Sequence, residues 1–191
     1  MDPATLVAEP LDGRRHDRAG FACGKPALDA YLARVAAQDA RRVASLTWVL
    51  VEADAPEPKP VAGYLSPAAV SIVLDGIPES RRADLARYPE VPAVLIARLA
   101  VATRYHGRGI GRRLMREAFV RAHVLARAHA GAALLTVDPL DDEATRFHAG
   151  FGFESLTGSR RLFLTMTDVA TTAAGRRRRR TPRPSHAPPP C

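Results

Sequence analysis

The stretch AVLIARLAVATRYHGRGIGRRLMR, residues 93–116, decides the fold class of this chain. An apolar run typical of a buried β-strand leads through a short basic turn to glycines at three alternate positions, Gly107, Gly109 and Gly111. An amphipathic helix is predicted to follow. Glycines let successive main-chain N–H groups point toward one place, and a helix N-terminus adds unpaired amides and the positive end of its dipole. The stretch therefore predicts a binding site for anionic oxygens such as those of phosphate.

The glycine spacing does not fit two common nucleotide-binding motifs. The dinucleotide fingerprint G-x-G-x-x-G needs an acidic residue about 20 positions later, and neither that spacing nor an acidic residue at 129–133 is present. The Walker sequence G-x-x-x-x-G-K-[ST] is also absent. The stretch instead resembles motif A of the GNAT acetyltransferases, [QR]-x-x-G-x-[GA], which binds the pyrophosphate of acetyl-CoA. His106 stands where Gln or Arg is usual.

Other segments carry the same resemblance over about residues 5–168. ALLTV at 133–137 and FHAGFGF at 147–153 are similar to the fifth strand and the following helix end of GNAT proteins. Upstream, three segments resemble a narrower group, the acetyltransferase toxins of bacterial toxin–antitoxin pairs (the TacT and AtaT group). These segments are FACGKPALDAYL (21–32), GYLSPAAVSI (63–72) and LARYPEVPAVLIARLAV (85–101).

Length and composition fit one folded domain with a basic tail. At 191 residues and 47% apolar composition, the chain can bury a sizeable core. We expect residues 1–170 to form the acetyltransferase domain and residues 171–191, rich in Arg and Pro, to be disordered. The tail holds six basic and no acidic residues, which leaves 22 basic and 20 acidic residues in the rest of the chain. Most of the net charge of +8 thus lies in the tail, either as a solvated extension or as an RNA-binding arm.

The sequence shows no signal for a membrane, for secretion or for a metal. It has no run of 18 apolar residues, and its first residues lack the pattern of a signal peptide, so we expect a cytoplasmic protein. Two cysteines, Cys23 and Cys191, form neither a disulfide framework nor a metal-ligand cluster. Cys23 is either a small buried residue or a reactive thiol.

The hydrophobic pattern predicts a mixed α/β (α+β) fold. In the first helix, which begins at Pro26, a buried stripe is expected at Leu28, Tyr31, Leu32 and Val35. The order of elements resembles the GNAT fold, whose mixed sheet splays between its fourth and fifth strands and takes up pantetheine in the gap. The expected strands are 5–11, 46–52, 61–65, 93–101, 133–137 and a final strand or hairpin through 161–166; the other helices are a short one at 79–87 within a variable insertion at 72–92, one at about 109–129 and one at 141–149.

The resemblance implies an acetyl-CoA site along the fourth strand and the glycine loop. Main-chain groups of the strand would pair with pantetheine, and the amides of residues 108–112 would bind the pyrophosphate. The alternatives are a flexible turn for the glycines and a solvated role for each arginine. The implied cofactor-binding residues are Leu99, Ala100, Val101, His106, Gly107, Arg108, Gly109, Ile110, Gly111, Arg112 and Phe147.

His148 occupies the position at which related enzymes have a tyrosine, which is thought to protonate the departing CoA thiolate. An imidazole with a pKa near 6.5 is mostly neutral at pH 7 and still donates one N–H. The alternative is a partly exposed helix histidine without a role, in which case water protonates the thiolate or catalysis is weak.

No acidic residue is required as a general base for one class of substrate. An α-amine with a pKa near 8 is about 10% neutral at pH 7, whereas a lysine side chain is roughly 0.04% neutral. The acidic residues near the predicted site are expected to cap the helix at 141–149 instead. They are Asp138, Asp141, Asp142 and Glu143.

The resemblance to the toxins implies acetylation of the α-amine of aminoacyl-tRNA, a homodimer and a small ribbon-helix-helix antitoxin. A tRNA substrate requires residues that neutralise phosphates near the cleft. The expected ones are Arg34, Arg41, Arg42, Arg98 and Arg104, although a row of arginines on a helix is also typical of a solvated face. Two other functions stay open: a GNAT enzyme that modifies a polyamine, an antibiotic or a protein N-terminus, and a CoA-binding subunit that acts as a repressor or RNA-binding module.

Overall fold

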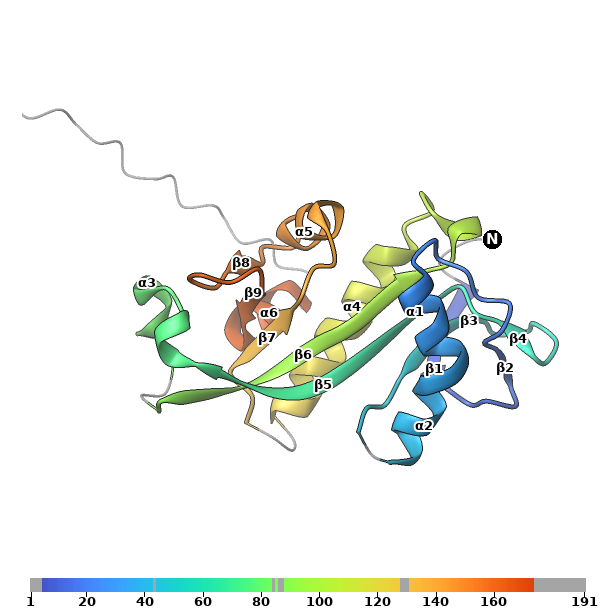
Figure 1. The fold of residues 1–191 in the computed structure, drawn as a ribbon, viewed down its shortest axis with the longest axis horizontal. Helices are drawn as coiled ribbons and strands as arrows, with labels where there is room; N and C mark the ends of the chain where they lie inside the picture. Colours follow the sequence, from blue (N-terminus) through green and yellow to red (C-terminus); the bar gives the residue numbers. More distant parts are fainter. Residues whose placement is uncertain (1–4, 43, 84, 86–87, 128–130, 174–191) are drawn as a thin grey trace, which may run out of the picture.

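The computed structural model describes residues 5–42, 44–83, 85, 88–127 and 131–173, which form a seven-stranded sheet with helices on both faces (Figure 1). Neighbouring strands are antiparallel except for one parallel pair in the middle, so the predicted mixed sheet is confirmed. In spatial order the strands are β1 (Leu6–Pro10), β3 (Trp48–Glu52), β5 (Gly63–Val73), β6 (Glu90–Val101), β7 (Leu134–Val137), β9 (Leu162–Thr165) and β8 (Glu154–Ser155). The parallel pair is β6 and β7.

The helices follow the predicted order with one addition at the end of the described chain. The α-helices are α1 (Pro26–Ala30), α2 (Ala36–Arg41), α3 (Glu79–Arg82), α4 (Ile110–Leu125), α5 (Asp142–Ala149) and α6 (Met166–Ala173). Shorter turns are η2 (Tyr31–Val35), η3 (Leu74–Gly76) and η4 (Thr103–Tyr105), and a small parallel pair joins β2 (His16–Asp17) to β4 (Lys59–Pro60). Of the helix expected at 109–129, residues 128 and 129 lie outside the described residues, as do residues 174–191 of the expected tail.

The first helix contains a π-helical turn, which makes the predicted stripe wrong at Val35. The amide of Ala36 donates to the carbonyl of Tyr31, a bond to the fifth preceding residue instead of the fourth. The inward-facing position therefore moves one residue along the chain. Ala36 is fully buried and Val35 is 40% exposed, while Tyr31 and Leu32 are buried as expected.

Strands β5 and β6 form a hairpin longer than the sequence predicts. Their pairing extends from Gly63 with Val101 to Val73 with Glu90, so both ends of the expected insertion at 72–92 belong to the strands. The connection between the strands contains η3 and α3. The register shifts between Ser66 and Pro67, where proline lacks the N–H that a regular ladder would use.

Helix α6 was not expected. Its first turn carries the capping-box sequence Thr-x-x-Asp: the amide of Asp168 donates to Oγ1 of Thr165 at 3.2 Å, and that hydroxyl donates to the Asp168 carboxylate at 3.0 Å. Threonine followed three positions later by aspartate is a signal that predicts this helix. The helix crosses the expected domain boundary at residue 170 and reaches Ala173.

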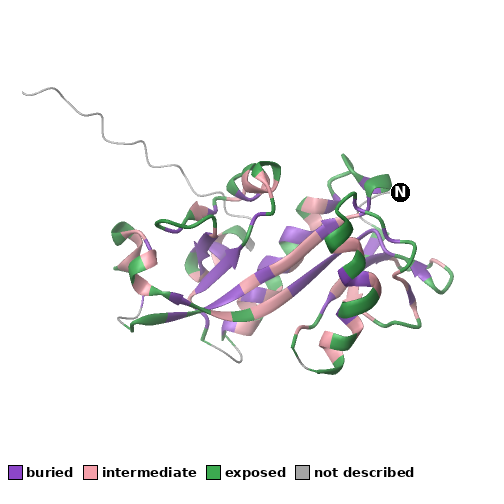
Figure 2. Ribbon diagram, in the orientation of Figure 1, coloured by how far each residue is buried: buried purple, intermediate pink, exposed green. Residues whose placement is uncertain are grey.

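The two faces of the sheet are covered by different helices (Figure 1). In β5, the buried side chain of Tyr64 faces the first helix and its hydroxyl donates to the carbonyl of Leu28 at 2.8 Å. The adjacent Gly63 faces α4, because successive residues of a strand point to opposite sides. Figure 2 shows buried residues concentrated in the strands and in the helix faces turned toward them. Among the described residues, no helix has the length and apolar character needed to cross a membrane.

At Gly63, strand β5 lies very close to both β6 and α4. A Cβ atom at this position would lie 2.9 Å from the carbonyl oxygen of Ala100 and 2.9 Å from Cδ1 of Leu114. We expect Gly63→Ala to lower the free energy of unfolding in urea by about 1–3 kcal/mol, because β6 or α4 must move. Gly76→Ala is the control, since a Cβ there meets nothing within 4 Å. Equal stability of the two variants would contradict the close-packing explanation.

Candidate active site

A cavity of about 720 Å³ opens where β6 separates from β7. Only residues 93–96 of β6 pair with β7, so on that side residues 97–101 have no strand partner and line the cavity instead. The N-terminus of α4, the start of α1 and the inner face of α5 form the other walls. The splay expected between the fourth and fifth strands is therefore present, with main-chain groups of β6 at its edge.

The glycine loop precedes α4 at one end of this cavity. Gly107 and Gly109 have left-handed φ angles of 73° and 78°, while a Cβ on either would meet nothing within 4 Å. Backbone conformation, not space, therefore requires glycine at both positions. Gly109 is the N-cap of α4, and its carbonyl accepts the first helical bond from the amide of Arg113 at 3.1 Å. The amides of the three residues between them have no helical acceptor, and they form a cradle for anionic oxygens.

His106, the departure from the usual motif, ties this loop to β6. Its Nε2 donates to the carbonyl of Val101 at 2.9 Å, because a carbonyl only accepts. The side chain therefore occupies a main-chain acceptor at the open end of β6, one of those implied for pantetheine. This contact could not be expected from the motif, which has Gln or Arg at this position.

Gly111 allows α5 to pack against the start of α4. A Cβ at Gly111 would lie 3.3 Å from the ring of Phe147, which is tight contact. The Phe147 ring lies against those of His148 and Phe151, with centroids 5.1 Å apart in both pairs. The glycine thus places two cavity-lining rings, Phe147 and His148, next to the phosphate cradle.

His148 lies in an apolar environment that keeps it neutral. The residue is only 4% exposed, and its ring packs against Phe147 and Phe153. Burial lowers its pKa from the usual 6.5 to about 4. Its Nδ1 is buried without a hydrogen-bond partner among the described residues. The alternative to a catalytic His148 assumed that this histidine is partly exposed, and that assumption is wrong.

Sequence reasoning missed an ion pair at the cavity wall. Lys25, next to the start of α1, donates from Nζ to the carboxylate of Asp141 at 2.8 Å, and both residues line the cavity. The Lys25 ammonium lowers the pKa of Asp141, which also caps α5 by accepting from the amide of Ala144. The capping role of Asp141 was expected, whereas Asp138 instead binds the guanidinium of Arg161 through two bonds of 2.6 Å.

Cys23 lines the same cavity as a protonated thiol. It is buried, and burial raises its pKa to about 11. At neutral pH the thiolate is a minor species, which agrees with the reading of Cys23 as a small buried residue.

The structure distributes the predicted site residues over three places. All eleven implied cofactor-binding residues except Arg108 line the cavity, together with His148 and Arg98. Arg98 stacks over the ring of Tyr31 at 3.6 Å, while Arg104 and Arg108 are exposed and lie over the Tyr105 ring at 5.0 and 5.9 Å. Arg34 and Arg41 line a separate groove, and the exposed Arg42 lines neither. The five arginines expected to contact tRNA therefore do not form one continuous cluster.

Comparison with known proteins gives the same picture over most of the chain. Residues 73–155 match the family model of the acetyltransferase (GNAT) domain. A tRNA-acetylating toxin of Mycobacterium tuberculosis is 33% identical over 155 residues, which cover 80% of this chain and 88% of the relative. The chain belongs to the GNAT acetyltransferase family. It is an N-acetyltransferase that uses acetyl-CoA as its acetyl donor.

Other relatives agree with this assignment. A probable toxin TacT of Sinorhizobium fredii is 28% identical to the acetyltransferase and covers 87% of it and 94% of the relative. Among solved structures, a mutant of KacT superposes with a TM-score of 0.81 at 23% identity, covering 88% of this chain and 99% of that one. AtaT in complex with acetyl-methionyl-tRNAfMet superposes with a TM-score of 0.79 at 24% identity, covering 87% and 98%. These two structures show that the fold is shared.

The residues present fit acetyl-CoA. The open cradle at Gly107 and Gly109 has space for phosphate oxygens, and exposed Arg112 lies beside it. The unpaired stretch of β6 offers main-chain groups to an extended amide-containing arm. Phe147 and His148 line the cavity beyond that stretch.

We expect Gly109→Ala to weaken acetyl-CoA binding about tenfold in calorimetry, because an alanine at this φ angle is strained by about 1–2 kcal/mol and the cradle relaxes. Gly158→Ala is the matched control. Gly158 also has a left-handed φ of 68° and open space around it, but it does not line the cavity. Both variants should lose similar stability, and an equal loss of acetyl-CoA affinity in the control would contradict the cradle.

His148 should make the stability of the fold depend on pH. Its pKa is about 4 in the folded protein against about 6.5 unfolded, so its neutral form contributes stability that is present above pH 6.5 and lost as pH falls toward 4. We expect wild type to lose about 2–3 kcal/mol more than His148→Phe between pH 7.5 and 4.5, measured by urea unfolding. Parallel pH curves for the two proteins would show that the imidazole is solvated.

Proposed function

We propose that this acetyltransferase is a toxin that acetylates the α-amine of the amino acid on aminoacyl-tRNA and thereby blocks translation. The observation that carries this proposal is the 33% identity, over 80% of the chain, to a protein named as a tRNA-acetylating toxin. The AtaT complex adds support, since a protein of the same fold holds an acetylated aminoacyl-tRNA.

The acidic groups of the cavity agree with an α-amine as acceptor. Three acidic residues line the cavity. Asp138 and Asp141 are engaged by Arg161 and Lys25, so neither carboxylate is placed to accept a proton without giving up a partner. The third, Glu143, is exposed in the first turn of α5. An α-amine has a usable neutral fraction at pH 7 and needs little help from a general base, whereas a lysine side chain needs much more. An α-amine is therefore the acceptor that depends least on a carboxylate in this cavity.

His148 is the group that we assign to the leaving sulfur. Acetyl-CoA supplies an acetyl group activated as a thioester. A neutral imidazole carries one N–H, and His148 donates a hydrogen bond from it to the sulfur as negative charge develops there. The amide forms as the C–S bond breaks, and the proton that the attacking nitrogen loses passes to the departing thiolate. Because burial keeps the pKa near 4, the ring holds this protonation state throughout pH 6–9.

We also propose the partners and the location that the family resemblance implies. Related structures contain AtaT with the antitoxin AtaR, and we assign to this chain a ribbon-helix-helix antitoxin and a homodimeric state. Charged tRNA places the reaction in the cytoplasm. The acetyltransferase domain is assigned to the chain up to Ala173, where α6 ends, and the Arg/Pro-rich extension follows it.

The test is to incubate the protein with radiolabelled acetyl-CoA and total aminoacyl-tRNA and to measure which fraction carries label. We expect label on the aminoacyl-tRNA, released when the ester is hydrolysed. His148→Ala and His148→Phe should both lower kcat about 10²-fold with little change in KM for acetyl-CoA.

His123→Ala is the matched control, because His123 lies on α4 and does not line the cavity. Label found only on polyamines or protein N-termini would refute the tRNA substrate. Unaltered kcat of both His148 variants across pH 6–9 would remove His148 from the mechanism.

A further inference from the structure

A second hollow, of about 520 Å³, lies at the far end of the first helix, and we call it the basic groove. Four arginines line it: Arg14 from the loop between β1 and β2, Arg18 directly after β2, and Arg34 and Arg41 from η2 and α2. One acidic residue, Asp12, also lines it. The groove therefore combines residues from two segments that the sequence keeps apart.

Most of the positive charge in the basic groove is uncompensated. Within the part of the chain that the structure describes, the side chains of Arg14, Arg34 and Arg41 form no ion pair or hydrogen bond, and all three are exposed. The Asp12 carboxylate accepts the amide of Arg14 and not its guanidinium. Arg18 uses one nitrogen to donate to the carbonyl of Ala33 at 3.0 Å, which fastens the loop to the helix. Three guanidinium groups thus face solvent around one hollow.

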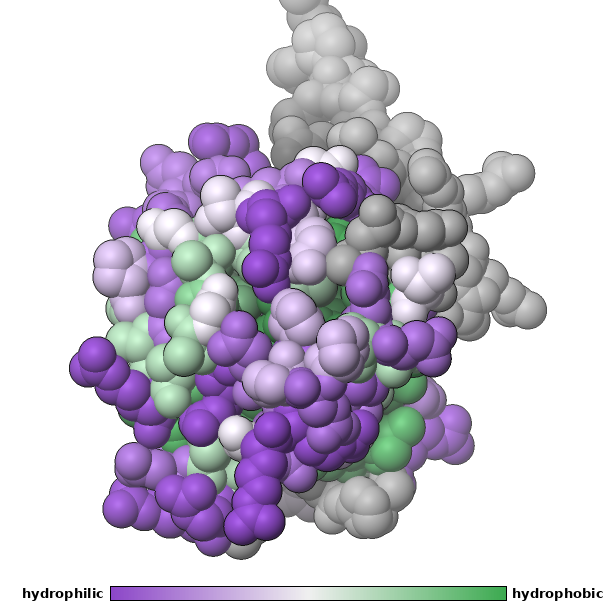
Figure 3. Space-filling model, turned by 90° about the vertical axis from the view of Figure 1, so that its right-hand side faces the viewer, coloured by the Kyte–Doolittle hydropathy of each residue, from purple (hydrophilic) through white to green (hydrophobic). Residues whose placement is uncertain are grey.

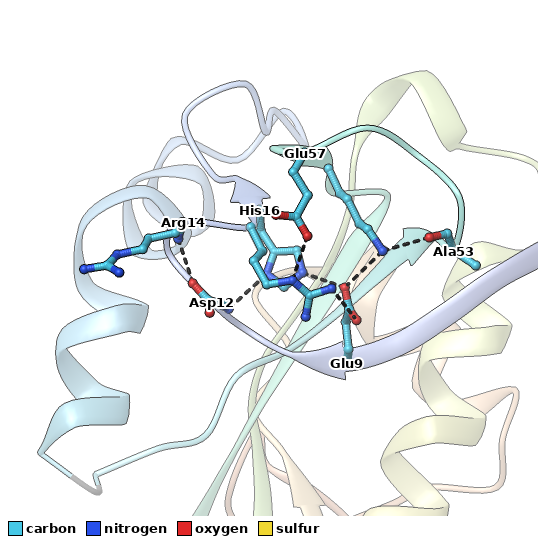
Figure 4. Close-up of polar contacts among 8 residues, drawn as sticks. Glu9, Asp12, Arg14, His16, Ala53 and Glu57 are labelled. Atoms are coloured by element: carbon cyan, nitrogen blue, oxygen red, sulfur yellow. Dashed lines mark hydrogen bonds and ion pairs between the residues drawn. The ribbon is translucent and has the colours of Figure 1, made fainter.

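The loop that carries Arg14 is held in place by hydrogen bonds to the buried His16. His16 is completely buried; its Nδ1 accepts the amide of Asp12 at 2.9 Å, and its Nε2 donates to the Glu9 carboxylate at 2.8 Å (Figure 4). Lys59 and Arg15 lie 3.8 and 3.7 Å from the same carboxylate. The hydrogen bond from His16 and these cations lower the pKa of Glu9. Arg14 points away from this cluster (Figure 4), so the buried network supports the loop while leaving the guanidinium available.

The first helix connects the basic groove to the active-site cavity. Ala27 and Leu28 at its start line the cavity, while Ala37 and Arg41 near its end line the groove. At 1.5 Å per residue, Leu28 and Arg41 are about 20 Å apart along the helix. A stacked nucleic acid strand rises about 3.4 Å per nucleotide, so this distance corresponds to about six nucleotides. The side of the molecule that holds β2 and β4 is predominantly hydrophilic (Figure 3).

We propose that the basic groove binds the sugar–phosphate backbone of the RNA strand whose aminoacylated end enters the cavity, about six nucleotides from that end. The inference rests on the proposed function and specifies where the RNA lies. An acidic segment of a protein partner would be the alternative occupant of the basic groove. RNA is favoured because the same helix lines both hollows and uncompensated guanidinium groups match regularly spaced phosphates.

The test uses Arg14→Gln, Arg41→Gln and the double variant, none of which removes a described side-chain contact. Arg116→Gln is the control, because it removes an arginine that is also exposed but lies on α4, on the opposite face of the sheet. Filter binding of uncharged tRNA at several KCl concentrations gives affinity and salt slope. We expect the double variant to bind at least tenfold more weakly, with the slope of log K against log[KCl] reduced by about 0.7–0.9 per lost contact.

Substrate length gives a second readout. Full-length charged tRNA should show a raised KM with the double variant, whereas an aminoacylated CCA trinucleotide, which is too short to reach the basic groove, should not. Acetyl-CoA affinity should stay unchanged in every variant. The proposal that the basic groove binds RNA would be overturned if the double variant kept the wild-type tRNA affinity and salt slope, or if Arg116→Gln lost as much tRNA affinity.

The two proposals fail separately. Wild type that acetylates charged tRNA while the arginine variants bind tRNA normally refutes the basic groove alone. Wild type that binds tRNA through Arg14 and Arg41 but transfers no acetyl group to charged tRNA refutes the proposed function and supports the groove. Wild type that does not bind tRNA refutes the groove.

Discussion

The early separation of β6 from β7 is the constraint on which the site depends. A parallel pair that continued beyond Ile96 would close the sheet and remove the cavity. Because the pairing stops there, the main chain of β6 keeps unpaired polar groups that a ligand or solvent must satisfy. The antiparallel pairing with β5 continues to Val101 on the other side, so the open edge stays rigid. Pairing with β5 thus holds β6 in place while its other edge stays open to a ligand.

Sequence patterns revealed the parts of the site whose chemistry is local. Gly107 and Gly109 were recognisable because their backbone conformations exclude most other residues. Asp141 was recognisable as a cap because it directly precedes its helix. The extension of β5 was missed because its outer half lacks a regular burial pattern, and the bulge at Pro67 interrupts it. Helix α6 was missed although its capping box is visible in the sequence.

Long-range contacts account for what sequence could not reveal. The burial of His148, and hence its low pKa, depends on Phe153 folding back over the ring after the turn. The ion pair of Lys25 with Asp141 joins segments 116 residues apart. The basic groove needs Arg14 from a loop without periodicity, held in place by the buried His16. The ion pair and the groove require elements distant in the chain, and the contact of Phe153 with His148 requires the chain to turn back directly after α5, so none of them follows from the residue types alone.

The π-helical turn at Tyr31–Val35 changes how the first helix must be compared with a regular one. One extra residue in a turn rotates everything after it by about 100° relative to an uninterrupted α-helix. Ala36 is buried, and Ala37 and Arg41 face the basic groove, only in this rotated phase. A regular α-helical turn formed by the same residues would therefore direct Val35 instead of Ala36 to the core, whereas deletion of one residue from the turn would remove the π bulge and leave the side chains that follow on the faces they now occupy.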